Sequence, residues 1–592
     1  MNGNAYVAPL RAMGSLLRAI TIALCITALH GGATVDELGE AWITEPKSGS
    51  VVEGPVVDVE IGLRRGSATA GATSACISAA RVVDGDPLPG DDRWPSAECS
   101  DVSLPSVHDD ARSLVARVAL DLRPPGWYRV DVVLRGGPAG DADAPAISEF
   151  AVAVFVAGAA EPEPDRSRLL GLAWDWGGGI GWGVAGLHIA LALGGPRSTA
   201  LPVPLGQVHG YEVTPAQRRT LEPSVLAAAA ERLASRGRRA SALDFPVVHA
   251  LGRWGVNGSL GSMDEALWSA TRNVGVLFAE TLDWSQSDLA ALRRFDALLV
   301  GSTWCGAGLE AAAAALDGAP LPPVTAFMQG VDGSLFKPPT GVRRNPGARF
   351  RVFSGGKLEW RKGQDIVVAA FREFRRRHPD ADAELVVAWA NPWRTTVLTM
   401  ANATHTAGVP AATRQQVLEA NATAPLPRTD ADYVDENAAL LDWLEANGLD
   451  RRDVVPLIPV HHRYVPQILR AVDAALFPNR AEGGTNLVAM EAVAMGVPTA
   501  LARNTGQADL VDFLGGDDGC WPLGNQVESP AARAAPDQFA GYETDPGDAA
   551  AALADIYRDR AAARRRALRG AKRMRAWSWE SAVEVLTDAA FG

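Results

Sequence analysis

The chain has 592 residues, of which 47% are hydrophobic and 21% charged, and its formal net charge is −13 at pH 7. This composition is ordinary for a folded protein, and the length suggests about four domains of ~150 residues, or fewer large ones. The negative charge argues against nucleic acid as the main partner, because a polyanion would be repelled over most of the surface. The five cysteines show neither a C-x-x-C motif nor zinc-ligand spacing, which argues against a cysteine-based metal site.

Residues 1–34 are predicted to be a signal peptide or an N-terminal anchor. Arg11 and Arg18 precede an apolar run over residues 19–29, which is too short to span a bilayer comfortably. A cleaved signal and an uncleaved anchor both fit, and a disordered extension is the plain alternative. We therefore expect a secretory location, in the endoplasmic reticulum or Golgi lumen or outside the cell. The location is cytoplasmic if the segment is not a signal, and membrane association through the N-terminus stays open.

Residues 40–158 are predicted to form a small β-sandwich. Apolar and polar residues alternate over 57–63, 114–122 and 128–134, and the turn signal Arg-Pro-Pro-Gly separates the last two runs. The pattern around this turn resembles a corner of immunoglobulin-like modules. Cys76 and Cys99 lie in this segment and either form a disulfide or are two unrelated thiols.

A charged, proline-containing linker over residues 159–168 separates this module from a first αβ domain over residues 169–336. The domain opens with a predicted strand at 169–174, a glycine loop and a helix at 184–193. A dinucleotide site is not favoured, because no acid follows the G-x-G-x-x-G pattern at the distance a ribose contact needs. The loop glycines are instead candidates for approaching phosphate or acceptor, with a packing role as the alternative: Gly179, Gly181 and Gly183.

Four further strand-length runs alternate with helical stretches, which predicts a parallel sheet covered by helices. They are residues 244–251, 274–280, 297–302 and 323–329. Ligands of such sheets bind beyond the carboxyl ends of the strands. His249, Glu280 and Ser302 are expected at such ends, and His249 is a catalytic candidate with a structural role as its alternative.

The second αβ domain is expected over residues 349–548. After a strand at 350–354, glycines allow a close turn, and Lys357 and Lys362 follow. Two cations here would offset the charge of a diphosphate, with an exposed basic turn as the alternative.

Residues 474–500 combine a strand, a glycine-containing turn and a helix start. Backbone N–H groups and the helix dipole at such a start both favour an anion. Glu482 and Glu491 would accept hydrogen bonds from sugar and ribose hydroxyls. The combination predicts a nucleotide-sugar site.

These segments carry a family resemblance that covers residues 169–592. Residues 474–500 resemble the E-x7-E region of retaining GT-B glycosyltransferases, and residues 354–371 resemble their G-[RK]-L-x-x-x-K-G segment. Gly330-Val331-Asp332 with Phe336 and Pro338 is similar to the crossover between the two domains, and Trp577-Ser578-Trp579-Glu580 to the terminal helix. The family is the glycosyl transferases group 1, which contains sucrose, mannosyl and glycogen-type synthases.

The resemblance implies an α/β GT-B fold, with two Rossmann-like domains facing a cleft behind the β-sandwich. It also implies transfer of a hexose, with retention of configuration, from a nucleotide sugar to a glycan, lipid or protein hydroxyl. The donor is a substrate, and neither a cofactor nor a metal is expected. Glu482 and His249 are the implied catalytic residues. The implied donor-binding residues are Gly356, Lys357, Lys362, Gly483, Gly484, Thr485, Asn486, Leu487 and Glu491.

One departure from the family concerns the two glutamates, since eight residues separate Glu482 from Glu491 where the family has seven. Either the turn absorbs the extra residue or the role of the first glutamate has moved. Alternatives to a transferase are a non-catalytic carbohydrate-binding protein on a degenerate scaffold, a phosphorylase or a sugar-nucleotide epimerase.

The remaining features lie toward the C-terminus. Residues 394–449 look like an insertion, and N-x-T sequons at Asn402 and Asn421 support a secretory route together with the signal. Residues 549–592 are expected to be helical, with one helix over 549–577. Its arginine cluster is interpreted as a solvated face, with a membrane-surface contact as the alternative.

Overall fold

The computed structural model describes residues 41–45, 50–53, 56–63, 74–81, 100–103, 114–121, 126–135, 146–157, 165–177, 181–205, 217, 220–221, 223–224, 243–252, 270–339, 349–391, 394–410, 430–457, 462–529 and 541–592. The chain divides into two compact units. The first comprises Met1–Asp165, Asp175–Gly178 and Val203–Arg239, and the second comprises Arg166–Trp174, Gly179–Pro202 and Ala240–Gly592. The predicted signal or anchor, Cys99 and Asn421 lie outside the described residues.

The strands described in the first unit are β1 (Ala41–Glu45), β2 (Ser50–Glu53), β3 (Val56–Leu63), β4 (Ser74–Arg81), β5 (Ser100–Ser103), β6 (Leu114–Asp121), β7 (Gly126–Arg135) and β8 (Ala146–Ala157). Three alternating runs of the sequence coincide with strands of this unit: residues 57–63 with β3, 114–122 with β6 and 128–134 with β7. The structure describes the further strands beside these three. One sheet has the order β1-β3-β6 and the other β2-β8-β7-β4-β5. Neighbouring strands are antiparallel except for the parallel pair β2 and β8. The sandwich and its immunoglobulin-like classification remain predictions.

The first αβ part of the second unit is built on a six-stranded sheet of order β10-β9-β11-β12-β13-β14. Its strands are β9 (Leu169–Ala173), β10 (Leu201–Pro204), β11 (Val247–Gly252), β12 (Asn273–Phe278), β13 (Ala297–Val300) and β14 (Val324–Ala326). The strands from β9 through β11 to β14 pair in parallel. The helices of this part are α2 (Gly181–Leu193), α6 (Gln286–Leu292) and α7 (Thr303–Leu316). Parallel strands covered by helices are confirmed, as the alternation of elements predicts.

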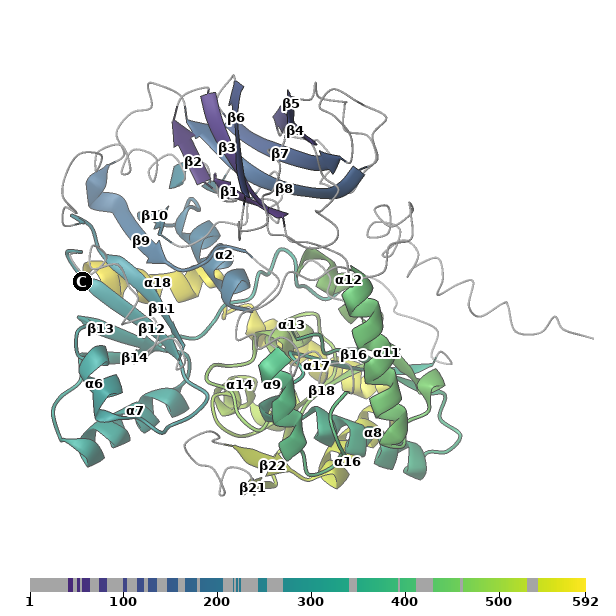
Figure 1. Ribbon diagram of the computed structural model, residues 1–592. Helices are drawn as coiled ribbons and strands as arrows, with labels where there is room; N and C mark the ends of the chain where they lie inside the picture. Colours follow the sequence, from purple (N-terminus) through teal and green to yellow (C-terminus); the bar gives the residue numbers. More distant parts are fainter. Residues whose placement is uncertain are drawn as a thin grey trace, which may run out of the picture. The chain divides into compact units, whose positions relative to one another are not determined.

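The second αβ part has a six-stranded parallel sheet of order β17-β16-β15-β18-β19-β20 (Figure 1). The strands are β15 (Phe350–Gly355), β16 (Ala383–Ala388), β17 (Val454–Pro456), β18 (Ala474–Phe477), β19 (Thr499–Ala502) and β20 (Trp521–Leu523). Counted along the chain, this is the order 3-2-1-4-5-6 of the doubly wound Rossmann type. The chain direction across the sheet reverses between β15 and β18, which is the point where ligands of this fold bind.

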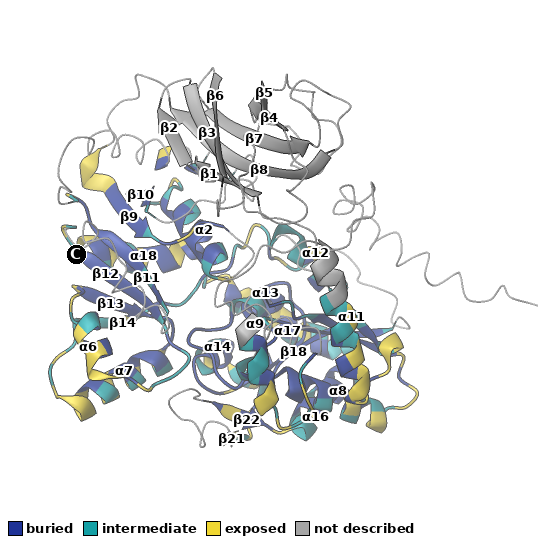
Figure 2. Ribbon diagram, in the orientation of Figure 1, coloured by how far each residue is buried: buried dark blue, intermediate teal, exposed yellow. Residues whose placement is uncertain are grey.

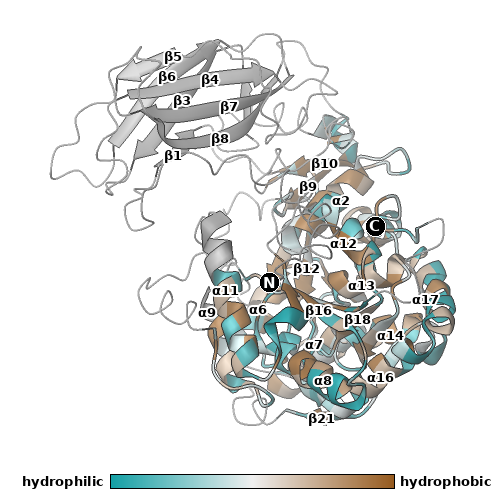
Figure 3. Cartoon of the chain, turned by 90° about the vertical axis from the view of Figure 1, so that its right-hand side faces the viewer, coloured by the Kyte–Doolittle hydropathy of each residue, from teal (hydrophilic) through white to brown (hydrophobic). Residues whose placement is uncertain are grey.

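Helices and short strands complete the second part. They are α8 (Gln364–Arg377), α9 (Arg394–Val397), α11 (Asp430–Ala446), α12 (Val465–Arg470), α13 (Leu487–Ala494), α14 (Gln507–Phe513), β21 (Gln526–Glu528) and β22 (Tyr542–Thr544). Figure 2 shows β18 and α13 almost wholly buried, whereas α8 is exposed on one side. The exposed side of α8 is also hydrophilic (Figure 3). Continuous apolar strands such as β18 are typical of parallel sheets covered on both faces.

The C-terminal segment differs from the single helix expected over residues 549–577. It forms α16 (Pro546–Arg558), α17 (Arg560–Met574) and α18 (Trp579–Phe591). The break falls at Asp559, whose side chain accepts a hydrogen bond of 2.8 Å from the backbone N–H of Ala562 and so caps α17. α18 returns to the first αβ part and packs against α2 and β12.

The arginine cluster of α17 has acidic partners in the turn before β20. Arg566 pairs with Asp517 at 2.8 Å, and Arg569 and Arg573 each pair with Asp518 at 2.7 Å. These pairs give an acidic partner to three arginines of the cluster. No helix in the described part of the chain combines the length and the apolar character that a membrane crossing requires.

Candidate active site

Two loops meet at the reversal point of the second sheet. The loop after β15 contains Gly356, with a φ of 125°, then Lys357 and a 3₁₀ turn at Trp360–Lys362. The loop after β18 runs over residues 478–486 into α13. Because β15 and β18 are adjacent and parallel, their carboxyl ends bring the two predicted signature segments together.

Main-chain contacts hold these loops together. The carbonyl of Arg361 accepts hydrogen bonds from the N–H groups of Arg480 (2.8 Å) and Ala481 (3.2 Å). Gly363 has a φ of 68°, and a Cβ at this position would lie 2.4 Å from the carbonyl oxygen of Pro478. Only glycine fits both the conformation and the space, so this close approach depends on the lysine-glycine pair of the segment.

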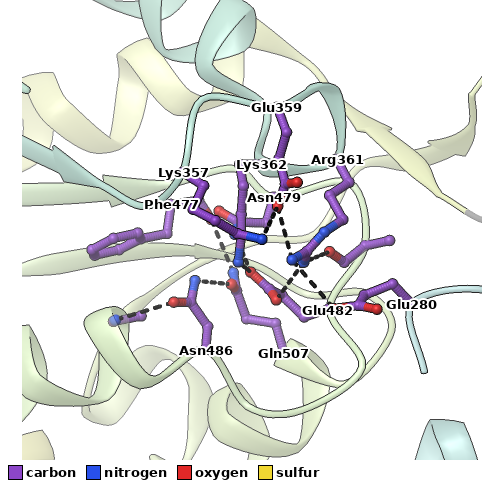
Figure 4. A network of polar contacts seen from close by, with 12 residues as sticks. Glu280, Lys357, Glu359, Arg361, Lys362, Phe477, Asn479, Glu482, Asn486 and Gln507 are labelled. Atoms are coloured by element: carbon purple, nitrogen blue, oxygen red, sulfur yellow. Dashed lines mark hydrogen bonds and ion pairs between the residues drawn. The ribbon is translucent and has the colours of Figure 1, made fainter. Parts of the chain in front are cut away.

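Glu482 is the centre of a buried charge cluster (Figure 4). One of its carboxylate oxygens accepts from Lys362 Nζ at 2.5 Å, and the other accepts from Arg361 at 2.9 Å. Asn479 donates a further hydrogen bond to the first oxygen. Arg361 also pairs with Glu359 at 2.8 Å and with Glu280, which follows β12 of the first sheet, at 3.2 Å.

The cluster shifts the pKa of each member in a way that its surroundings explain. Burial lowers the pKa of Lys362 and Arg361 lowers it further, and the carboxylate of Glu482 only partly offsets this. Burial acts to raise the pKa of Glu482, but Lys362 and Arg361 hold it below its ordinary value. For Arg361, burial acts against the charge, yet Glu359, Glu280 and Glu482 raise its pKa. The site therefore places two basic side chains around one buried carboxylate.

Lys357 is less tightly held than Lys362. Its side chain is 34% exposed, and its Nζ lies 3.8 Å from Glu359. This distance is too long for a hydrogen bond, so the ammonium can turn toward a ligand. The donor-binding prediction for Lys357 is compatible with this geometry.

The turn between the two glutamates, at Gly483 and Gly484, packs closely against the first sheet. A Cβ at Gly483 would lie 2.7 Å from the carbonyl oxygen of Ala279, and one at Gly484 would lie 2.8 Å from the Phe278 ring. Ser302 donates a hydrogen bond of 2.9 Å to the carbonyl oxygen of Gly483. A glutamate could not occupy position 483, where a spacing of seven would place it, so the carboxylate of this turn has to come from Glu482.

The rest of the turn supports the start of α13. Asn486 has a φ of 65° and caps α13 by accepting from the N–H of Ala489. Its amide donates to Gln507 at 2.9 Å, while the buried Thr485 contacts Met490. Leu487 is the first residue of α13. The predicted turn and helix start are confirmed, and their positions leave the helix N-terminus beside the charge cluster.

Glu491, on the second turn of α13, is 4% exposed and accepts a hydrogen bond from His462 Nε2 at 2.5 Å. His462 starts a 3₁₀ turn, His462–Tyr464.

The expected place of His249 at a strand end is wrong. His249 is the third residue of β11 and pairs with Ala173 and Gly275 of the neighbouring strands. Its ring is 1% exposed and contacts Asn273 at 2.8 Å, and burial lowers its pKa to about 4. The strand continues to Gly252, so His249 lies inside the sheet and not at the strand end where ligands of such sheets bind.

Glu280 and Ser302 do follow the carboxyl ends of their strands, β12 and β13, and both contact the second αβ part. The glycine loop is shorter than expected. Gly181 and Gly183 belong to the first turn of α2, and Gly179 lies outside the described residues.

Several residues of the cluster were not among the predicted site residues. Arg361 is the clearest case, and its position next to Lys362 in a basic Arg-Lys-Gly run was an available signal. Asn479 contacts Glu482 within the same loop, three residues away. Thr505 and Gln507 join through contacts between separate loops, for which a single sequence carries no signal. Among the described residues, no three His, Cys, Asp or Glu side chains are grouped so that they could hold a metal ion.

Comparison with protein families gives one match, over residues 459–586, to the family described as "Family 4 Glycosyltransferase in conflict systems". This segment includes both glutamates and α13 and confirms the glycosyltransferase resemblance for the C-terminal part of the chain. The curated proteins contain no significant match.

Solved structures with a similar fold include sucrose-phosphate synthase from Thermosynechococcus elongatus (15% identity, TM-score 0.45, 71% of this chain and 98% of that chain covered). The Anabaena protein HepE in complex with UDP gives 17% identity, a TM-score of 0.42 and coverages of 71% and 98%. A UDP-forming trehalose-phosphate synthase from Burkholderia xenovorans gives 13% identity and a TM-score of 0.41, with 72% of this chain and 98% of that chain covered. At these TM-scores the similarity carries no argument about the reaction.

Proposed function

We propose that the protein is a retaining glycosyltransferase of the GT-B class that moves a hexose from a nucleotide sugar to an acceptor hydroxyl. The observation that carries the proposal is the meeting of Lys362, Arg361 and Glu482 with the N-terminus of α13 at the reversal point of the second sheet. Cations and a helix N-terminus suit a diphosphate, and buried carboxylates suit sugar hydroxyls.

The charge cluster supplies what the departure of a nucleoside diphosphate requires. Negative charge develops on the diphosphate as its bond to the sugar breaks, and preorganised cations stabilise this charge. In the proposal Lys362, Arg361 and Lys357 contact the diphosphate, Glu482 contacts the sugar and Glu491 the ribose. A phosphate beside Lys362 would raise the pKa of its amine and favour the charged form when the donor binds.

A panel of UDP, GDP and ADP hexoses tests this function, with release of nucleoside diphosphate as the readout. We expect one donor to be hydrolysed slowly without acceptor. Lys362→Met should lower this turnover about 10²-fold, the effect of removing one group that stabilises developing charge. Lys572→Met, an equivalent change at an exposed position on α17, should not alter it. No turnover with any donor would favour the non-catalytic carbohydrate-binding alternative, and NMR of the transfer product reports whether configuration is retained.

We propose that this turnover does not depend on a metal, because three basic side chains lie where a metal would otherwise offset charge. The assay is therefore repeated with excess EDTA. Unchanged rates are expected, whereas loss of activity that Mn²⁺ restores would contradict the proposal.

We also propose a secretory location. The proposal is based on the N-terminal apolar run, the pair Cys76 and Cys99, and the sequons. Asn402 is exposed, as a glycan acceptor must be. Mass mapping of native protein should find a Cys76–Cys99 bridge and glycan on Asn402 or Asn421. Two free thiols and unmodified asparagines would place the protein in the cytosol.

A further inference from the structure

A half-buried imidazole contacts the glutamate that the proposed function assigns to the ribose. His462 Nε2 lies 2.5 Å from Oε1 of Glu491, and an ionised carboxylate can only accept, so Nε2 carries the proton. Glu491 makes no other side-chain hydrogen bond to the described residues. One oxygen of Glu491 is therefore occupied, and the other remains able to accept from a ligand.

The His462 ring has a defined place because two rings from other parts of the chain pack against it. The Phe336 ring lies 5.1 Å away, and the His188 ring on α2 lies 5.5 Å away in an edge-on arrangement. His188 in turn stacks on Trp579 of α18 at 5.7 Å and lies 3.9 Å from Asp332. A ring packed in this way has little rotational freedom, and its contact with Glu491 restricts the rotation of that carboxylate.

The charges around His462 favour its contact with Glu491. Burial acts to lower the pKa of His462, but Glu491 and then Asp332 raise it above the ordinary value. The neighbouring His188 is the reverse case, since burial and His462 lower its pKa to about 4 despite Asp332 and Glu580. Of the two imidazoles, His462 has the raised pKa and His188 the lowered one, and His462 is the one that contacts Glu491.

We propose that His462 is a positioning residue for nucleotide recognition, which holds Oε1 of Glu491 so that Oε2 faces the ribose hydroxyls of the donor. The inference rests on the proposed function and deepens it, because it assigns ribose discrimination to a pair of residues. A free glutamate would have to lose side-chain rotation on binding, whereas a glutamate already held in place does not. Removing the positioning contact should therefore cost affinity only for ligands that carry the hydroxyls.

Two substitutions separate positioning from a general structural role. His462→Gln keeps an amide N–H near the place of Nε2, whereas His462→Asn offers its amide near the place of Nδ1, too far from Glu491. The measurement is calorimetric binding of UDP, GDP and ADP, followed by the 2′,3′-dideoxy analogue of whichever binds best. Inorganic pyrophosphate serves as a probe of the phosphate site, and Glu491→Gln as the reference for loss of the carboxylate.

The natural protein is expected to prefer the ribonucleotide over its dideoxy analogue by about tenfold or more. His462→Asn should lose most of this preference, as Glu491→Gln does, while His462→Gln should keep it within about threefold. Pyrophosphate affinity should be the same in all four proteins, which shows that the variants are folded.

The two proposals can fail separately. If no nucleoside diphosphate binds, the proposed function is wrong. If the ribonucleotide is preferred and His462→Asn retains that preference, the function stands and the positioning role is overturned. Equal loss in both His462 variants would also overturn it, because the Nε2 donor would then not be what matters.

Discussion

At the level of single residues, charge placement separates the histidines that belong to the site from those that belong to the core. His462 faces a carboxylate, which raises its pKa, whereas His249 faces an amide inside the sheet and its pKa falls to about 4. In the sequence, His249 stands alone, whereas His462 is one of an adjacent pair with His461. The strand that contains His249 runs from Val247 to Gly252, so the ring lies inside the sheet and not at its edge.

The buried His249 predicts a specific loss of stability in acid. Its pKa in the folded state is about 4 against an ordinary value of 6.5, so the stability it contributes is complete above pH 6.5 and is lost as pH falls toward 4. Between pH 7.5 and 5 this single group accounts for about 2 kcal/mol. In His249→Gln the fall in urea midpoint between these pH values should be smaller than in the natural protein.

The control for this prediction is His378→Gln, at the half-buried end of α8. It should leave the pH dependence as it is. Donor turnover of His249→Gln at pH 7.5 should stay within about threefold of the natural value if this residue has no role in the chemistry. A much larger loss of turnover would make His249 a catalytic candidate again.

At the level of elements, a second group of charged residues, centred on Arg480, holds the loops of the site together. No local sequence pattern predicts this group. Arg480 is fully buried and makes paired hydrogen bonds of 2.7 Å to Asp365 on α8. It also contacts Glu543 of β22 at 2.8 and 2.9 Å and the carbonyl of Trp360 at 2.8 Å. One side chain thus joins both signature loops to a helix and a strand.

Replacing Arg480 should destabilise the second αβ part and weaken its donor site together. Arg480→Met leaves two carboxylates buried without their partner, a change that typically costs about 3–5 kcal/mol. We expect a marked fall in the thermal midpoint and weaker pyrophosphate binding, since the Arg361 and Lys362 turn loses its anchor. Arg452→Met, at an 87% exposed arginine, is the control and should leave both measurements unchanged. Normal stability in Arg480→Met would mean that water replaces the guanidinium.

The elements also show what the sequence could and could not reveal. β15 and β18 were placed to within one residue, because central parallel strands are continuous apolar runs with abrupt ends. The helix expected over residues 549–577 was wrong because Asp559, unremarkable in an alanine- and arginine-rich run, acts as a cap. The motifs gave Lys362, Glu482 and Glu491, and Arg361 and Asn479 lie within three residues of them in the sequence. The contact of His462 with Glu491 depends on how distant segments meet, which requires the fold.

At the level of the second unit as a whole, the site depends on contacts between its two sheets. Besides the bond from Ser302 to Gly483, Asp509 of α14 accepts from the N–H and the hydroxyl of Thr303 at 2.7 and 2.6 Å. Thr303 begins α7, so a carboxylate from one αβ part lies at a helix N-terminus of the other, where the helix dipole favours it. These contacts hold the Gly483–Gly484 turn against β12.

This arrangement predicts that Asp509 affects catalysis more than stability. In Asp509→Ala, α7 keeps its own cap, because Ser302 still accepts from the N–H of Cys305. The thermal midpoint should therefore change little, whereas kcat/KM for donor turnover should fall roughly tenfold as the two parts separate more readily, in keeping with the cost of small misplacements in an active site. Asp512→Ala is the matched control on the same helix, since Asp512 pairs only with the exposed Arg503, at 2.8 Å, among the described residues. If both variants lose turnover equally, the effect belongs to α14 itself, and the contact between the sheets has no part in catalysis.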